Sequence, residues 1–179
     1  MGPATRKFHR TAAPWIAVLL VLTLLTGMAY RIGKAWFRLD VDLADRILEI
    51  HSGSWLGSWG ALIYVVVVGS GLLAMVVTGA ILLFKTKSGK GGRPVHRVLG
   101  LALFVPLAAT ALTGIAYKAG EEWLGLPDDV LKFFMLVHEG GWLGKAVRPW
   151  YVLVLGLGLL ALIITGLLLT RRSRRIRWN

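Results

Sequence analysis

The chain is organised around Arg93-Pro-Val-His96-Arg97, the apolar run behind it, and the closing stretch Thr113-Gly114-Ile-Ala116-Tyr117. The same pattern occurs earlier, as Arg6-Lys-Phe-His9-Arg10, an apolar run, and Thr26-Gly27-Met-Ala29-Tyr30. The offset is 87 residues, and about 32 of the 92 pairs formed at this offset are identical. Apolar composition alone would match Leu with Leu, but not His with His or Trp with Trp. The sequence therefore predicts an internal duplication.

A second motif recurs at the same offset. His51-Ser-Gly-Ser-Trp55-Leu-Gly57 corresponds to His138-Glu-Gly-Gly-Trp142-Leu-Gly144. Further along, the dipeptide Thr78-Gly79 corresponds to Thr165-Gly166. All four histidines of the chain thus belong to duplicated pairs.

The composition is that of a membrane protein, with 56% hydrophobic residues and a mean hydropathy of +0.66. Four apolar runs each approach the ~20 residues that a helix needs to cross a ~30 Å hydrocarbon core. They cover residues 12–30, 61–84, 99–117 and 150–170. We expect an all-α membrane protein, a four-transmembrane-helix bundle with short interfacial helices in the outer loops. Its two tandem two-helix repeats, 1–87 and 88–179, would be related by a pseudo-twofold axis along the membrane normal.

The charges predict the orientation. The two chain ends and the middle loop carry 13 Lys and Arg and no acidic residue, whereas the other two loops hold the remaining 8 and all 9 Asp and Glu. By the positive-inside rule, both termini and the middle loop are cytoplasmic. The net charge of +12 is then a topology signal, and we expect membrane lipid, not nucleic acid, as the partner.

The chain has no cysteine. Disulfides, cysteine-ligated iron–sulfur clusters and covalent haem attachment through Cys-x-x-Cys-His are therefore excluded. Any metal or cofactor must be held by histidine, acidic or oxygen ligands.

Each histidine precedes one of the expected spans. His9 and His96 precede the outward-running spans, and His51 and His138 precede the inward-running ones, so we expect one pair at each membrane face. In an antiparallel bundle the twofold axis brings the members of each pair opposite one another. Two facing imidazoles at each face are what two bis-histidine haems require. We predict two haem b groups, the inner one held by His9 and His96 and the outer one by His51 and His138.

Small and basic residues are placed to serve the same sites. Each inner histidine lies 18 residues before a glycine, which is five helical turns, so that the two share one face of the helix. We expect these glycines, Gly27 and Gly114, to line the outer haem, where the absence of a side chain lets a flat ring approach. The residues expected to line the inner haem in the same way are Thr78, Gly79, Thr165 and Gly166. The arginines expected to pair with the propionates of the inner haem are Arg6, Arg10, Arg93 and Arg97.

Other interpretations of these residues stay open. A histidine at a membrane edge is often only an interfacial polar residue. Imidazole also suits copper, zinc or nickel, although two imidazoles without carboxylate or thiolate make a poor closed site for those ions. Thr-Gly pairs also serve helix packing alone. Six tryptophans of the outer segments fit an aromatic belt at the membrane surface, namely Trp36, Trp55, Trp59, Trp123, Trp142 and Trp150.

At these residues the chain resembles the PepSY-associated transmembrane helix family (PepSY-TM). The resemblance rests on Arg-x-x-His-Arg, Thr-Gly-x-Ala-Tyr and His-x-Gly-x-Trp-Leu-Gly in both repeats, and it covers all four spans. It implies an inner-membrane protein linked to iron uptake, of the kind that includes di-haem reductases of ferric siderophores, with His9, His96, His51 and His138 as ligands. Longer members carry a large extracytoplasmic domain, whereas each outer segment here has about 30 residues, which favours a cytochrome subunit that serves a separate partner.

We therefore predict a b-type di-haem electron-transfer protein of the bacterial inner membrane, either an oxidoreductase of the ferric-reductase kind or an electron-transfer subunit. Bis-histidine ligation leaves no open iron position, which suits electron transfer and not oxygen chemistry. The expected donor is a quinol or another protein, and the expected acceptor is a periplasmic ferric chelate or redox protein. The alternative is a haem-free scaffold or regulatory subunit of an iron-uptake or other membrane complex.

Overall fold

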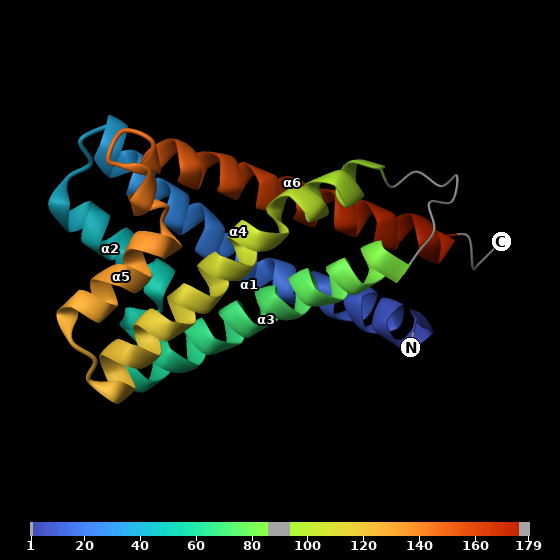
Figure 1. The fold of residues 1–179 in the computed structure, drawn as a ribbon, viewed down its shortest axis with the longest axis horizontal. Coiled ribbons are helices and arrows are strands. Elements are labelled where there is room, and N and C mark those ends of the chain that lie inside the picture. The colour runs from blue at the N-terminus through green and yellow to red at the C-terminus, as the bar shows by residue number, and fades with distance from the viewer. Residues whose placement is uncertain (1, 86–93, 176–179) are drawn as a thin grey trace.

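The computed structural model describes residues 2–85 and 94–175, and every regular element within them is a helix (Figure 1). Four helices are long and apolar enough to cross a membrane, which makes the chain a multi-pass membrane protein. They are α1 (Gly2–Trp36), α3 (Gly57–Lys85), α4 (Pro94–Ala119) and α6 (Arg148–Arg175). The shorter elements are α2 (Val41–Ser52), η1 (Ser54–Leu56), the π-helical turn η2 (Gly120–Leu124), α5 (Asp128–His138) and η3 (Gly141–Leu143).

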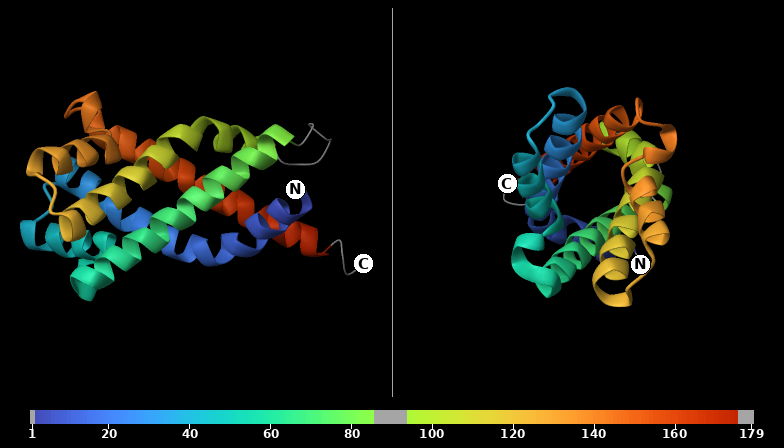
Figure 2. Two further views of the ribbon diagram at one scale, coloured as in Figure 1. Left: turned by 60° about the horizontal axis from the view of Figure 1, so that its bottom comes forward. Right: turned by 90° about the vertical axis from the view of Figure 1, so that its left-hand side faces the viewer.

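The long helices alternate in direction, so that α1 begins and α6 ends at one end of the bundle (Figure 1). We call this the terminal end, and the opposite end, which carries α2 and α5, the loop end. Helix α1 packs against α3 and α6, and α4 packs against the same two helices. Helices α1 and α4 therefore occupy opposite corners, as the view along the bundle in Figure 2 shows. The first and third spans are therefore diagonal partners, as in an antiparallel bundle with short connections.

A small apolar core lies between the helices, away from both ends. It consists of the buried side chains of Leu20, Val68, Leu72 and Ala111. Many large apolar side chains are exposed on the outside of the bundle, among them Trp15, with 80% of its surface exposed. An apolar exterior is what a helical bundle presents to lipid, because the hydrocarbon is as apolar as the side chains.

Glycines let the long helices approach closely. A Cβ added at Gly69 would lie 2.6 Å from the Ile115 side chain, and one added at Gly158 would lie 2.5 Å from that of Leu103. Both separations are too short for real contacts, so these neighbours occupy the space that the missing side chains leave. The result is tight packing of small residues at helix contacts, as in other membrane bundles.

Turns at the loop end set the direction of the short helices. The Asp40 carboxylate caps the start of α2 by accepting from the backbone N–H groups of Asp42 and Leu43, at 3.0 and 3.3 Å. Gly53 then ends α2 in the left-handed conformation, with φ +75°, and Gly140 follows α5 with φ +70°. These turns place His51 in the last turn of α2 and His138 at the last residue of α5.

The first and third spans end in the same backbone turn. Leu39 N–H bonds to Gly33 O, and Leu126 N–H bonds to Gly120 O, both at 3.0 Å. The residue before each leucine has a positive φ, which is 49° at Arg38 and 57° at Gly125. This is the Schellman turn that commonly ends helices with a glycine, and Arg38 adopts the required conformation without one.

Candidate functional site: two histidine pairs

His51 and His138 face one another at the loop end. Their ring centroids lie 6.3 Å apart, with the ring planes inclined at 66°. Helix α2 packs against α1 and helix α5 packs against α4, so His51 lies on the α1 side of the bundle and His138 on the α4 side. Two short helices thus bring the two imidazoles together across the bundle.

One ring nitrogen of each loop-end histidine is fixed by the backbone. His51 Nδ1 lies 2.8 Å from Thr23 O, and His138 Nδ1 lies 2.9 Å from Thr110 O. A carbonyl oxygen can only accept a hydrogen bond, so both Nδ1 atoms carry the hydrogen. Nε2 is then the nitrogen with the free lone pair, and a ring held in this way is typical of a metal-ligating histidine.

Glycine makes these bonds possible. Gly27 and Gly114 each lie four residues after the threonine whose carbonyl is used, where a side chain would cover that carbonyl. A Cβ at Gly27 would lie 2.7 Å from His51 Cε1, and one at Gly114 would lie 2.9 Å from His138 Cε1. The structure thus places both glycines at the predicted pair, but against the imidazoles themselves. Their first role is to seat the histidines on α1 and α4.

The terminal-end histidines are held by side chains instead. His9 Nδ1 lies 2.7 Å from Thr78 Oγ1 on α3, and His96 Nδ1 lies 2.9 Å from Thr165 Oγ1 on α6. Each threonine hydroxyl donates its hydrogen to a carbonyl of its own helix, at 2.5 Å from Thr78 and 2.7 Å from Thr165. The hydroxyl oxygen therefore accepts from Nδ1–H, which leaves the ring lone pair on Nε2.

The glycines beside these threonines also lie at the histidines. A Cβ at Gly79 would lie 3.6 Å from His9 Cε1, and one at Gly166 would lie 3.3 Å from His96 Cε1. His9 and His96 are close enough for a charge on one to act on the other. The sequence predicted that both Thr-Gly pairs lie at the inner site, but it did not indicate the hydrogen bonds from the threonines.

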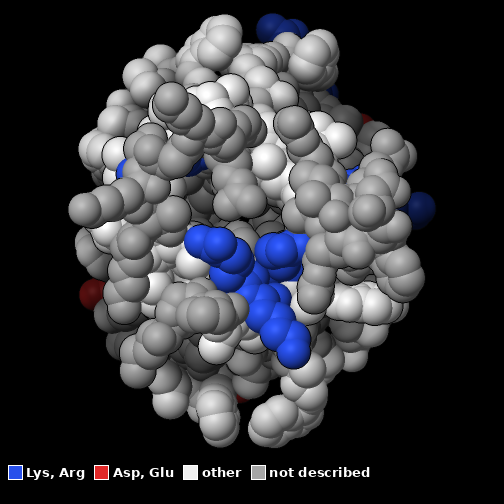
Figure 3. Space-filling model, turned by 90° about the vertical axis from the view of Figure 1, so that its right-hand side faces the viewer, with Lys and Arg blue, Asp and Glu red and all other residues white. Residues whose placement is uncertain are grey.

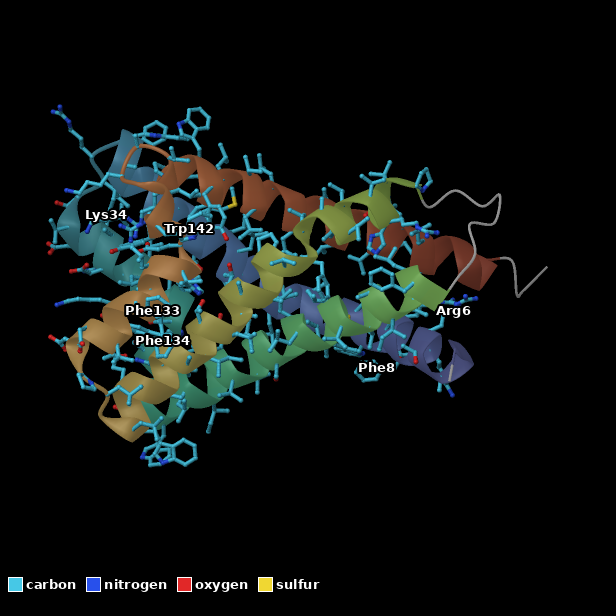
Figure 4. All side chains as sticks on the ribbon, viewed as in Figure 1. Arg6, Phe8, Lys34, Phe133, Phe134 and Trp142 are labelled. Atoms are coloured by element: carbon cyan, nitrogen blue, oxygen red, sulfur yellow. The ribbon has the colours of Figure 1, made fainter. Side chains whose placement is uncertain are left out.

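The predicted arginines gather at the terminal end. Arg6 is exposed there (Figure 4), Arg10 is half-buried, and Arg97 donates from Nη2 to Leu83 O at 3.4 Å. Arg93 lies outside the described residues. Figure 3 shows Lys and Arg side chains gathered in the middle of this end. Positive charge is therefore concentrated at the end of the bundle that holds His9 and His96.

Burial keeps the loop-end imidazoles neutral. It lowers the pKa of His51 below the ordinary value of 6.5, against the opposing effect of the bond to Thr23 O. It lowers the pKa of His138 to about 4, and a charge on nearby His51 acts in the same direction. Neutral imidazole is the form that binds metals, so both rings are in the ligating state at pH 7.

The spacing of the loop-end rings is close to that of two imidazoles on one metal. A metal–imidazole bond is about 2 Å and each nitrogen lies about 1 Å from its ring centre, so two rings on one metal have centres roughly 6 Å apart. The 6.3 Å separation agrees with this value. Among the described residues, no three His, Cys, Asp or Glu side chains gather as a metal-binding group. A bare ion would find only two imidazoles, whereas haem iron needs only two axial ligands from the protein.

A group of ion pairs beside the loop-end histidines was not predicted. The Glu139 carboxylate pairs with Arg31 of α1 and with Arg148, the first residue of α6. On the other side of the bundle, Lys118 Nζ lies 2.8 Å from carboxylate oxygens of Glu121 and Glu122. Position 139 holds an acid where the first repeat has Ser52, and this difference between the repeats was the only signal in the sequence.

Each two-helix half holds its own histidines. His9 is fixed by α3 and His51 by α1, while His96 is fixed by α6 and His138 by α4. Each half therefore contributes one imidazole to the loop end and one to the terminal end. No protein-family model, no curated protein and no solved structure matches the chain.

Proposed function

We propose that this chain is a b-type di-haem protein that carries electrons across the bacterial inner membrane. The observation that carries the proposal is the loop-end pair, His51 and His138, whose ring centroids are 6.3 Å apart and whose Nδ1 atoms are fixed by carbonyl oxygens. His9 and His96, fixed by threonine hydroxyls, would hold the second haem.

The chain's own residues determine what such a site does. Nδ1 bonds orient each ring and leave Nε2 as the ligating atom. At each level two imidazoles would hold the iron through Nε2, an arrangement that suits electron transfer and not oxygen chemistry. When bound, haem supplies a one-electron iron couple. The apolar core of Leu20, Val68, Leu72 and Ala111 lies between the two levels and excludes water and ions from the path.

Topology and symmetry follow from the sequence repeat. We propose a pseudo-twofold axis along the membrane normal, supported by the recurrence of the histidine contacts at an offset of 87 residues. The positive charge of the terminal end supports a cytoplasmic location for both termini. Arg10 and Arg97, each next to a terminal-end histidine, are the candidates for the propionates of the inner haem.

The proposed donor is a quinol or a redox protein, and the proposed acceptor is a periplasmic ferric chelate or redox protein. The resemblance to PepSY-associated transmembrane proteins supports a link to iron. The chain would then act either as a reductase itself or as the electron-transfer subunit of a larger complex.

A visible spectrum of the purified protein tests the proposal. We expect a reduced-minus-oxidised spectrum of b type and two haems per chain. His51→Ala and His138→Ala should each leave one haem, while Trp142→Phe, a change at an exposed neighbouring residue, should leave two. Protein that is folded but binds no haem under haem-replete expression would refute the proposal in favour of a haem-free scaffold.

A further inference from the structure

The ion pairs around Glu139 contain more positive than negative charge. Its carboxylate contacts Arg31 through one oxygen and Arg148 through the other, so that two guanidiniums share one carboxylate. All three side chains are largely covered, with 12% of the Glu139 side chain exposed, 20% of that of Arg31 and 28% of that of Arg148. A net positive charge is thus held in a partly desolvated place, where it attracts an anion strongly.

Two hydrogen-bond donors in this group have no acceptor. The Nε atoms of Arg31 and Arg148 are buried and without a hydrogen-bond partner among the residues that the structure describes. Buried donors in folded proteins are nearly always satisfied, so each of these groups is expected to bond to an ordered water or to a bound ligand. A guanidinium offers its N–H groups in a planar fork that matches a carboxylate.

The group lies directly beside the loop-end histidines. Glu139 follows His138 in the sequence, and Arg31 lies one helical turn beyond Gly27, the residue that seats His51. Four residues of α1 rise about 6 Å. The two guanidiniums are therefore on the loop-end side of the histidine pair.

The other half of the molecule does not offer the same charge. The residues at the positions that correspond to Arg31, Glu139 and Arg148 are Lys118, Ser52 and Ala61. Lys118 is already shared by two carboxylates, those of Glu121 and Glu122. An anion is thus attracted to the side of the loop end that holds Arg31 and Arg148 and repelled by the side that holds Glu121 and Glu122. A bound anion should therefore lie on the first of these sides.

We infer that Arg31 and Arg148 form a carboxylate-binding site beside the loop-end histidine pair, with their Nε–H groups as the vacant donors. The position of the site makes a haem propionate the favoured ligand, and in that form the inference rests on the proposed function. A soluble carboxylate has the same chemistry and is the other source.

Haem and haem dimethyl ester, which lacks free carboxylates, distinguish these sources. Both are titrated into haem-free protein in a His96→Ala background, so that only the loop-end pair can bind. We expect Arg148→Gln to weaken haem b binding roughly ten- to a hundredfold and to leave ester binding unchanged. Lys145→Gln, which removes the same charge from an exposed residue, is the matched control and should change neither. Equal weakening for haem b and for the ester would overturn the assignment of a propionate.

Glu139→Gln separates a binding role from a structural one. If the arginines bind a carboxylate, removing the competing Glu139 charge should leave haem b binding as tight as in the parent or tighter. If the arginines serve only to pair with Glu139, this variant should weaken haem b and the ester together, as Arg148→Gln would. That result would overturn the inference, and it does not depend on the stability of the arginine variant.

A haem-free measurement keeps the two proposals apart. Thermal unfolding of the apoprotein is compared in sodium acetate and in sodium chloride at equal ionic strength. We expect acetate to raise the Tm of the parent protein, but not that of Arg148→Gln. An acetate effect with identical haem b and ester affinities would assign the site to a soluble carboxylate. No acetate effect and no difference between haem b and ester would refute the site, whereas parent protein that binds no haem would refute only the proposed function.

Discussion

Replacing Gly27 by alanine should displace His51, whereas the same change at Gly79 should be harmless. A Cβ at Gly27 would lie 2.7 Å from His51 Cε1 and 2.9 Å from its Nδ1, so the ring must withdraw by about 0.7 Å to reach an ordinary contact of 3.4 Å. At Gly79 the new Cβ would already be at an ordinary distance, 3.6 Å from His9 Cε1. The two substitutions are chemically identical, and they differ in the space that each helix leaves for its histidine.

The expected magnitudes follow from this difference. Alanine in a helix is favoured over glycine by about 1 kcal/mol, so Gly79→Ala should stabilise the fold by up to that amount. At Gly27 the same gain is opposed by an overpacking cost of about 1–3 kcal/mol. Loss of the bond between His51 Nδ1 and Thr23 O would add about 1 kcal/mol. The two variants should therefore differ by about 2–4 kcal/mol, which is roughly 4–16 °C in Tm for a chain of this size.

Two measurements check the reasoning. Thermal unfolding of haem-free protein in detergent should rank the variants as Gly79→Ala, parent, Gly27→Ala, from most to least stable. In haem-loaded protein, Gly27→Ala should weaken the haem of the loop-end pair and leave that of the terminal-end pair. If Gly27→Ala is as stable as Gly79→Ala and keeps both haems, the glycine does not seat the histidine.

Four further results are expected. Arg38→Gly should raise the free energy of unfolding by about 1 kcal/mol, because Arg38 has φ 49° and glycine adopts this conformation without strain. Gly125→Ala at the equivalent turn, where a Cβ meets nothing within 4 Å, should lower it by about the same amount. An unchanged Tm in both variants would show that the turn is not strained. The pKa of His138 is about 4 in the folded protein and about 6.5 in the unfolded chain. The free energy of unfolding of haem-free protein should therefore fall by up to about 3 kcal/mol as the pH falls from 6.5 to 4. His138→Gln should flatten this pH profile. His96→Ala should remove one haem and leave the other, and loss of both haems in proportion would contradict the pairing within one end. A reporter fused after Asn179 should be active in the cytoplasm, and activity only outside it would reverse the proposed orientation.

The arrangement of the spans could be predicted from the sequence because it depends only on the length of the apolar runs and on the length of the connections. Four apolar runs near 20 residues leave few alternatives to four membrane-crossing helices, and short connections make neighbours antiparallel. The ends of the helices could not be predicted as well. The first apolar run covers 12–30, but α1 extends from Gly2 to Trp36. Once a helix is nucleated, polar residues such as Arg6 and Lys34 continue it at little cost outside the hydrocarbon core.

The site was predicted in outline and not in its contacts. The 18-residue spacing of histidine and glycine placed Gly27 and Gly114 at the loop-end pair, because helical periodicity is regular over five turns. The bonds to the carbonyls of Thr23 and Thr110 depend on how α2 and α5 turn back, which periodicity does not encode. Glu139 pairs with two arginines, and one of them, Arg31, lies more than 100 residues earlier in the chain. Only the packed structure brings these two segments together.

Because each half holds one histidine of either pair, neither pair exists until the two halves dock. Formation of the bundle from two inserted hairpins and capture of a bridging ligand are therefore linked equilibria. A ligand present at a hundred times its dissociation constant would shift docking by about 2.7 kcal/mol in favour of the joined state. If the proposed haem is the bridging ligand, residues 1–87 and 88–179 supplied as separate chains should associate more tightly when haem is available and less tightly when it is scarce.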